Sequence, residues 1–192
     1  MVNKVIFRKF GKIFIGDDIK VEESKPCNAS RVIRSSRVFP NDFNNHNTLF
    51  GGRLLSDMDQ VASISAAKHS RRECVTASVD TVEFLTPIRP EEAVTFESFV
   101  VWTGTSSMEV FIKVHAENMR TGESKIAAIS YFTFIALDSA GKPTKIPQVY
   151  PETIEERYLY EKSKQRTNYR NDKRVFNKET VSYLRKNHAW MA

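Results

Sequence analysis

Hydrophobic residues recur with two different periods along this chain. A polar segment that begins at Asn44 ends in Gly51-Gly52, and apolar or small residues then follow at three- and four-residue steps: Leu54, Leu55, Met58, Val61, Ala62 and Ser65. This spacing predicts an amphipathic helix, and the glycine pair predicts a sharp turn at its start. From about residue 74 to residue 137 the period becomes two, which predicts β-strands.

The period-two segments predict an antiparallel sheet with short turns. Strands are expected over residues 31–38, 74–84, 94–102, 108–117 and 126–137, with hairpin turns near residues 104 and 121. The last strand is apolar on both faces, which indicates a central, buried position. Because a single long apolar helix accompanies this sheet, the economical α+β arrangement wraps the curved sheet around that helix.

The two ends of the chain differ from this middle part. Residues 1–28 are interpreted as an N-terminal extension, formed by a non-essential leader and a polar linker over residues 21–29; residues 29–150 form the domain. Residues 151–192 are predicted to be a basic helical tail that starts at Pro151-Glu152-Thr153, and residues 169–191 are a candidate for a further helix.

Charge and composition exclude several classes of protein. The chain has 192 residues and a net charge of +6, and its residues from Thr153 onward hold ten Lys/Arg against five Asp/Glu. Interleaved charges predict a solvated helix, although a basic tail can also contact nucleic acid or an anionic membrane. No stretch approaches the roughly 20 apolar residues of a membrane span.

No familiar metal or nucleophile motif is present in the sequence. Cys27 and Cys74 fit neither a metal site nor a disulfide framework, which favours a reducing cytoplasm. The four histidines show no zinc spacing, and no Gly-x-Ser-x-Gly motif occurs. We therefore expect no metal and no cofactor.

Asp59 is the unusual residue of the predicted helix. Steps of three and four from it reach Leu55, Ala62 and Ala66, and a carboxylate on such a face is costly to bury unless it is paired or employed. An edge residue that faces water is the alternative. The N–H groups at Gly51-Gly52 are suited to an oxyanion, and with the Asn44 amide they suggest an acyl-transfer site.

Helix geometry separates these groups within one chain. Asp59 lies about two turns from Gly52, roughly 10 Å at the rise of an α-helix. A two-fold dimer that brings Asp59 of one chain to the loop of its partner removes this difficulty.

Several motifs, in the same order along the chain, resemble those of the acyl-CoA thioester hydrolases of the hot-dog fold. The resemblance covers roughly residues 30–156, and it rests on 44–52 (Asn-Asn-His-Asn-Thr-Leu-Phe-Gly-Gly), Met58-Asp59, 74–80 (Cys-Val-Thr-Ala-Ser-Val-Asp), 103–110 (Thr-Gly-Thr-Ser-Ser-Met-Glu-Val), Ala136-Leu137-Asp138, Gly141-Lys142-Pro143 and Pro151-Glu152-Thr153. It implies a sheet wrapped around one long helix. It also implies metal-independent hydrolysis of acyl-CoA to free fatty acid and CoA, by a dimer built into a trimer of dimers.

The family's catalytic pair, an Asn in the loop and an Asp on the helix that act across subunits, falls on Asn44 and Asp59. Asn47 stands where many relatives have glycine, and Asn45 and His46 vary in that loop, so the neighbouring asparagines leave some ambiguity; Asn44 is favoured.

Substrate contacts are expected at seven residues: Gly51, Gly52, Arg71, Thr76, Thr105, Ser106 and Ser107. The hydroxyls at the predicted hairpin tip could contact the CoA arm, and ordinary turn chemistry explains them equally well. Arg71 is either a phosphate partner or a charge that complements the helix C-terminus.

Two other functions use the same fold. A non-catalytic acyl-CoA sensor would bind nucleic acid through the basic tail, but the chain shows no helix-turn-helix pattern and keeps the Asn44/Asp59 pair. A hydratase or dehydratase would need a catalytic histidine, and His46 is the only candidate near the loop.

Overall fold

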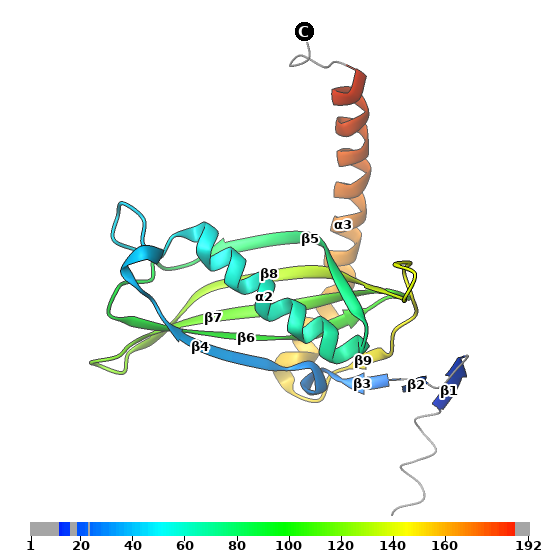
Figure 1. Cartoon of the computed structure of the whole chain (residues 1–192), viewed down its shortest axis with the longest axis horizontal. Helices are drawn as coiled ribbons and strands as arrows, with labels where there is room; N and C mark the ends of the chain where they lie inside the picture. Colours follow the sequence, from blue (N-terminus) through cyan, green and yellow to red (C-terminus); the bar gives the residue numbers. More distant parts are fainter. Residues whose placement is uncertain (1–11, 16–18, 23, 187–192) are drawn as a thin grey trace, which may run out of the picture.

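A computed structural model of the chain describes residues 12–15, 19–22 and 24–186. Its centre is a five-stranded antiparallel sheet in the order β4 (Val32–Arg37), β6 (Glu92–Thr103), β7 (Ser107–Asn118), β8 (Ser124–Leu137), β5 (Glu73–Phe84). The helix α2 (Gly51–Ser70) lies on one face of this sheet, and the helix α3 (Ile154–Lys186) begins on the other (Figure 1). This confirms the predicted α+β class and the five expected strands.

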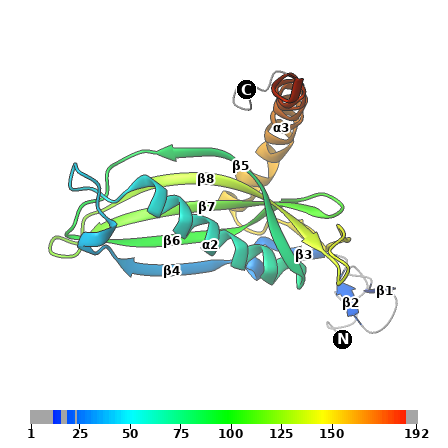
Figure 2. The same ribbon diagram turned by 45° about the horizontal axis from the view of Figure 1, so that its top comes forward.

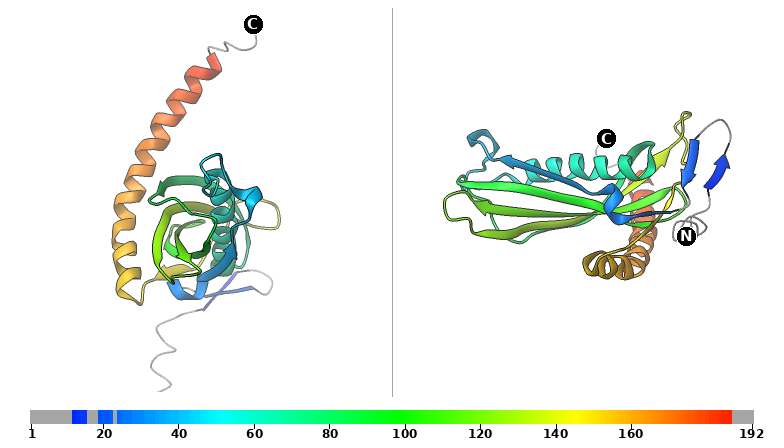
Figure 3. Two further views of the ribbon diagram at one scale, coloured as in Figure 1. Left: turned by 90° about the vertical axis from the view of Figure 1, so that its left-hand side faces the viewer. Right: turned by 90° about the horizontal axis from the view of Figure 1, so that it is seen from below.

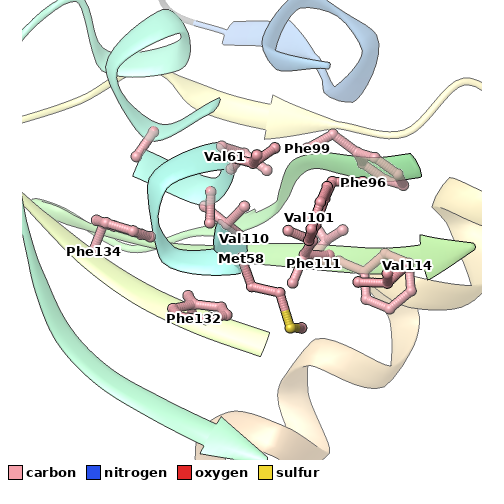
Figure 4. Packing of buried hydrophobic residues seen from close by; sticks show 14 of the residues in the cluster. Met58, Val61, Phe96, Phe99, Val101, Val110, Phe111, Val114, Phe132 and Phe134 are labelled. Atoms are coloured by element: carbon pink, nitrogen blue, oxygen red, sulfur yellow. The ribbon is translucent and has the colours of Figure 1, made fainter. Parts of the chain in front are cut away.

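The sheet curls around α2, as the end-on view in Figure 3 shows. The residues of α2 that face the sheet are buried at three- and four-residue steps: Leu54, Met58, Val61, Ala62, Ser65, Ala66 and His69. Figure 4 shows Met58 and Val61 among the aromatic side chains of the strands. Ser65 allows a close approach, because its Oγ lies 2.6 Å from Ser98 Oγ on β6. Each large apolar side chain in this interface contributes about 1.5–3 kcal/mol through burial.

The ends of α2 follow local sequence signals. The helix begins at Gly51, and Arg71 closes it in the left-handed conformation (φ 56°), with its N–H donating to Ala67 O at 2.8 Å. Lys68 lies in the last turn, where its positive charge complements the helix dipole.

The predicted linker is wrong for residues 24–29. β3 (Ser24–Pro26) pairs in parallel with β9 (Gln148–Tyr150), and a 3₁₀ turn over Cys27–Ser30 follows. Cys27 is fully buried, and Ser30 Oγ accepts a hydrogen bond from Val100 N at 2.9 Å. The polar composition of residues 24–29 therefore predicted a linker, although this segment packs against one end of the core. A second 3₁₀ turn, Pro40–Asp42, precedes the loop that leads to α2.

Helix α3 covers the outer, convex face of the sheet with its first half only. Leu159 and Ser163 are buried there, and Arg166 and Arg170 pair with Glu109, which is fully buried on β7. The prediction of a solvated tail is thus wrong for this half and correct for residues 171–186, which are all exposed. Residues 169–186 belong to the same continuous helix rather than to a separate one.

Some predictions lie wholly or partly outside the described residues. Of the predicted leader, the structure describes only the hairpin of β1 (Lys12–Ile15) and β2 (Ile19–Glu22), and residues 187–191 of the candidate further helix are not described. Within the described ranges, no helix has both the length and the apolar character needed to cross a bilayer.

His69 makes the stability of the fold depend on pH. Its ring is fully buried at the end of α2, where Nε2 lies 2.9 Å from Pro147 O and Nδ1 has no partner among the described residues. Burial lowers the pKa of His69 from 6.5 to about 4. In the unfolded chain the imidazole takes up a proton near pH 6.5. His69 therefore contributes stability that is present above pH 6.5 and is lost as the pH falls towards 4.

We predict that His69→Gln, which removes this titration, flattens the pH dependence of unfolding. Between pH 7 and pH 4.5 the parent protein should lose more free energy of unfolding than the variant, by an amount on the order of 2–3 kcal/mol. Urea unfolding at both pH values measures the difference. Equal losses in the two proteins would show that the pKa of His69 is the same in the folded and unfolded chains.

Candidate active site

The loop before α2 is a small hairpin held by Asn44. A bridge between Phe43 and Leu49 closes it, and Asn44 N donates to Thr48 O at 2.9 Å. The Asn44 side chain is half-buried; its Oδ1 accepts from His46 N at 2.9 Å, and its Nδ2 donates to Thr48 Oγ1 at 3.0 Å. The amide carries two N–H bonds, so one stays available to a ligand while the other fixes the orientation of the side chain.

The turn residue Asn47 gives the loop its shape. It adopts a left-handed conformation with φ 57°, and its N–H donates to Asn44 O at 3.0 Å. Asparagine tolerates this region better than most other side chains do, so the turn forms without a glycine at this position.

The start of α2 lies against two aromatic rings. A Cβ on Gly52 would lie 2.6 Å from the Phe50 ring, and one on Gly51 would lie 3.5 Å from the ring of Phe84, at the end of β5. Glycine at position 52 thus lets the helix begin close to Phe50. The N–H groups of this first turn have no helical acceptor and favour negative charge.

A hollow of about 300 Å³ lies beside this helix start. Its walls are Thr48, Leu49, Gly51, Leu54 and the segment from Phe84 to Ile88, so its lining is mostly apolar. Phe84 lines this hollow, whereas Met58 is buried in the core and Trp102 lies with its ring 5.8 Å from the guanidinium carbon of Arg170.

Asp59 is half-buried on α2 and faces β5. Thr76 Oγ1, on β5, donates a hydrogen bond of 2.8 Å to Asp59 Oδ1. Strand β5 is an edge strand, with β8 as its only neighbour among the described strands, and most of its residues are exposed. The structure thus brings together two predicted site residues, Asp59 and Thr76, at a free sheet edge.

The most buried carboxylate of α2 is Asp57, which sequence reasoning passed over. Its exposed fraction is 9%. Asp57 Oδ1 pairs with Arg34 at 2.5 Å, and its Oδ2 pairs with Arg53 at 3.2 Å. Arg53 at the i−4 position was a readable signal for one of these pairs, while Arg34 comes from a distant strand. Both carboxylate oxygens of Asp57 thus have structural partners.

Within one chain, the two parts of the candidate site lie far apart along β5. Asp59 meets the strand at Thr76, whereas Gly51 meets it at Phe84, eight residues further on. Along the strand, Thr76 and Phe84 lie roughly 25 Å apart, and along α2 the eight residues from Gly51 to Asp59 span about 12 Å. A single chain therefore does not assemble Asn44, the helix start and Asp59 around one substrate.

The remaining predicted contacts lie at the other end of the sheet from the Asn44 loop. Thr105, Ser106 and Ser107 form the turn between β6 and β7, where their carbonyls accept hydrogen bonds from Ile146, Ala136 and Gly104. Arg71, at the C-terminal end of α2, is exposed. No group of three or more His, Cys, Asp or Glu residues in the described part of the chain is arranged to hold a metal ion.

Comparison with known proteins identifies the family. A model described as the thioesterase superfamily matches residues 46–123. The chain is 51% identical over 172 residues to a protein of Bacillus subtilis (strain 168), named as the uncharacterized acyl-CoA thioester hydrolase YkhA; the match covers 90% of this chain and 100% of that protein.

Solved structures share the fold closely. An acyl-CoA hydrolase from Bacillus cereus superposes with a TM-score of 0.82 at 50% identity, covering 84% of this chain and 98% of the other. The acyl-CoA hydrolase of Staphylococcus aureus, solved with butyryl coenzyme A, coenzyme A and coenzyme A disulfide, gives a TM-score of 0.81 at 40% identity, with 84% and 98% coverage. It has also been solved with single alanine replacements of an aspartate, a threonine and an asparagine. The chain therefore belongs to the acyl-CoA thioester hydrolases of the thioesterase superfamily.

Proposed function

We propose that this enzyme hydrolyses acyl-CoA to a free acid and CoA in a site shared by two chains. One chain supplies Asp59 and Thr76, and its partner supplies the Asn44 loop and the start of α2. The observation that carries this proposal is the hydrogen bond between Asp59 and Thr76 at a sheet edge beside which the described part of the chain places no further strand.

Pairing of two β5 edges would bring the halves of the site together. Thr76 and Phe84 are equally distant from Asp80 along the strand. Antiparallel pairing of two copies with its two-fold axis near Asp80 therefore sets Thr76 opposite the partner's Phe84. Because the ring of Phe84 lies against Gly51, Asp59 then faces the partner's helix start.

The chemistry follows from these positions. A water molecule held by Asp59 gives up a proton to the carboxylate and attacks the thioester carbon. The carbonyl oxygen becomes an oxyanion near the N–H groups of Gly51 and Gly52, and the second N–H of the Asn44 amide orients the carbonyl or the water. Collapse of the tetrahedral intermediate breaks the C–S bond and returns the proton to the thiolate of CoA. In the alternative route, Asp59 attacks directly and water then hydrolyses the mixed anhydride.

The spacing of the polar residues supports this assignment. In the Staphylococcus aureus hydrolase, the replaced asparagine lies 15 residues before the replaced aspartate, and the replaced threonine lies 17 residues after it. Asn44, Asp59 and Thr76 share both spacings. This agreement favours Asn44 over the exposed Asn45.

Other parts of the assignment extend from the site. The apolar hollow beside Gly51 suits the acyl chain or the pantetheine arm. Arg71 and the 105–107 turn are proposed to contact the CoA part of the substrate. A trimer of dimers is proposed because structural neighbours include a hexameric acyl-CoA thioesterase with a TM-score of 0.77. A cytoplasmic location fits the two free cysteines.

The first prediction concerns Asp59→Asn, which keeps the shape of the side chain and removes its basicity. We expect kcat for acyl-CoA hydrolysis to fall by about 10²–10⁴-fold, measured by release of the free CoA thiol. Asp57→Asn is the matched control on the same helix; it should lower stability because Arg34 and Arg53 lose their anionic partner, while the enzyme stays active. Near-parental turnover by folded, assembled Asp59→Asn would rule out the proposed role.

A second prediction tests whether the site spans two chains. Asn44→Ala and Asp59→Asn chains should each be inactive alone. Co-expressed in equal amounts, they form mixed dimers with one intact site, so about a quarter of the parental activity should return. If both residues acted within one chain, every chain in the mixture would carry a defect and no activity would return.

A third prediction concerns the hydroxyl that holds Asp59. Thr76→Val removes this hydrogen bond and should lower kcat about tenfold with KM nearly unchanged, whereas Thr76→Ser keeps the hydroxyl and should restore most of the rate. Equal rates for the Val and Ser variants would show that the hydrogen bond does not position the carboxylate.

A further inference from the structure

One stripe of residues runs along almost the whole length of α3. At steps of three and four, which keep side chains on one helix face, it passes through Leu159, Ser163, Arg166, Arg170, Arg174, Asn177, Val181 and Leu184. The first four contact the convex face of the sheet: Leu159 and Ser163 are buried, and both arginines pair with Glu109.

The second half of this stripe continues past the edge of the sheet. Figures 1 and 2 show α3 passing β5, the last strand, and projecting beyond it. The exposed fraction is 5% for Leu159 but 45% for Val181 and 56% for Leu184. The helix thus presents the same face in both halves, and only the first half has a sheet beneath it.

The space beneath the second half is a hollow of about 860 Å³. Its walls are Ala77 to Asp80 of the β5 edge and, on α3, Arg170, Lys173, Arg174, Asn177, Lys178, Val181, Ser182, Arg185 and Lys186. Six of the α3 residues are cationic. The single carboxylate, Asp80, is already paired with Arg170 at 3.0 Å.

The convex side of β5 carries charge that matches this hollow. Thr81 pairs in register with Tyr131, whose ring lies 4.1 Å beneath the guanidinium of Arg166, so this side of β5 faces α3. Glu83, two residues further along the same face, is exposed and makes no ion pair within the described part of the chain. A second copy of β5 placed beside the first would bring its Glu83 under the basic residues of the arm.

We propose that residues 171–186 are an arm that docks on the convex face of a second copy of this chain. The arm crosses the line along which the two β5 edges pair. Its stripe then contacts the sheet of the partner, as the first half of α3 contacts its own sheet. This inference deepens the two-chain site of the proposed function and rests on it. By two-fold symmetry each chain then clamps the other, which holds Asp59 against the loop of the opposite chain.

The test uses full-length protein and a matched pair of substitutions. Val181→Asp places a charge on the docking stripe. Val175→Asp makes the same change on the same exposed half of α3, at a residue that does not line the hollow and is 59% exposed. Sedimentation equilibrium gives the concentration at which each assembly dissociates. We expect Val181→Asp to raise this dissociation concentration about tenfold or more, because each two-fold interface receives two buried charges. Val175→Asp should leave it unchanged.

A second pair tests the charges. Lys178→Glu, which lines the hollow, should weaken the assembly more at low salt than at high salt, while Lys164→Glu, exposed on the half of α3 that covers its own sheet, should not. Circular dichroism verifies that every variant keeps its helix. If both Val181→Asp and Lys178→Glu assemble as the parent does, the proposed docking of the arm is overturned. The roles of Asp59 and Asn44 are tested separately, by the kinetics of their own variants. Parental assembly together with loss of binding to a DNA duplex by Lys178→Glu would also overturn the proposed docking, since the basic face would then serve nucleic acid.

Discussion

The packing of α2 across the concave face of the sheet constrains everything else in this protein. A helix is rigid and rises 1.5 Å per residue, so burial of its apolar stripe fixes where each polar residue emerges. Gly51 is held at the Phe84 end of β5, and Asp59 is held at Thr76. The eight residues from Gly51 to Asp59 separate these groups by about 12 Å along the helix, which side-chain rotation alone does not close. The fold therefore separates two groups that the proposed chemistry needs together, and a second chain is the simple way to rejoin them.

The same edge strand explains the outer layer. Glu109 is fully buried on the convex side, which is tolerable only because Arg166 and Arg170 supply opposite charge. These arginines anchor α3 across β7, β8 and β5, and the helix then runs past the edge. An unpaired edge strand invites another strand. If a second copy continues the sheet at this edge, the same face of α3 can cover both sheets, and α3 does reach beyond the edge with that face unchanged.

Much of this architecture could be predicted from the sequence because its signals are local. The stripe of α2, the alternation in β7 and the apolar run of β8 each have one clear period, and the motifs around Asn44, Asp59 and Thr76 indicated the family. The errors came from long-range contacts. Cys27 is buried because β3 pairs with a strand more than 100 residues away, and the arginines of α3 looked solvated because their partner Glu109 lies on a distant strand. Asp57 was overlooked because the partner that completes its pairing, Arg34, is likewise remote in sequence.

The central claim is that Asp59 works against the asparagine loop of another chain. A crystal structure of the assembled enzyme with a non-hydrolysable acyl-CoA analogue tests it most directly. The account predicts that the carboxylate of Asp59 from one chain and the amide of Asn44 from its partner both lie within hydrogen-bond reach, about 3 Å or one bridging water, of the thioester group. An analogue bound between Asp59 and Asn44 of the same chain, or bound with Asp59 facing open solvent, would contradict it.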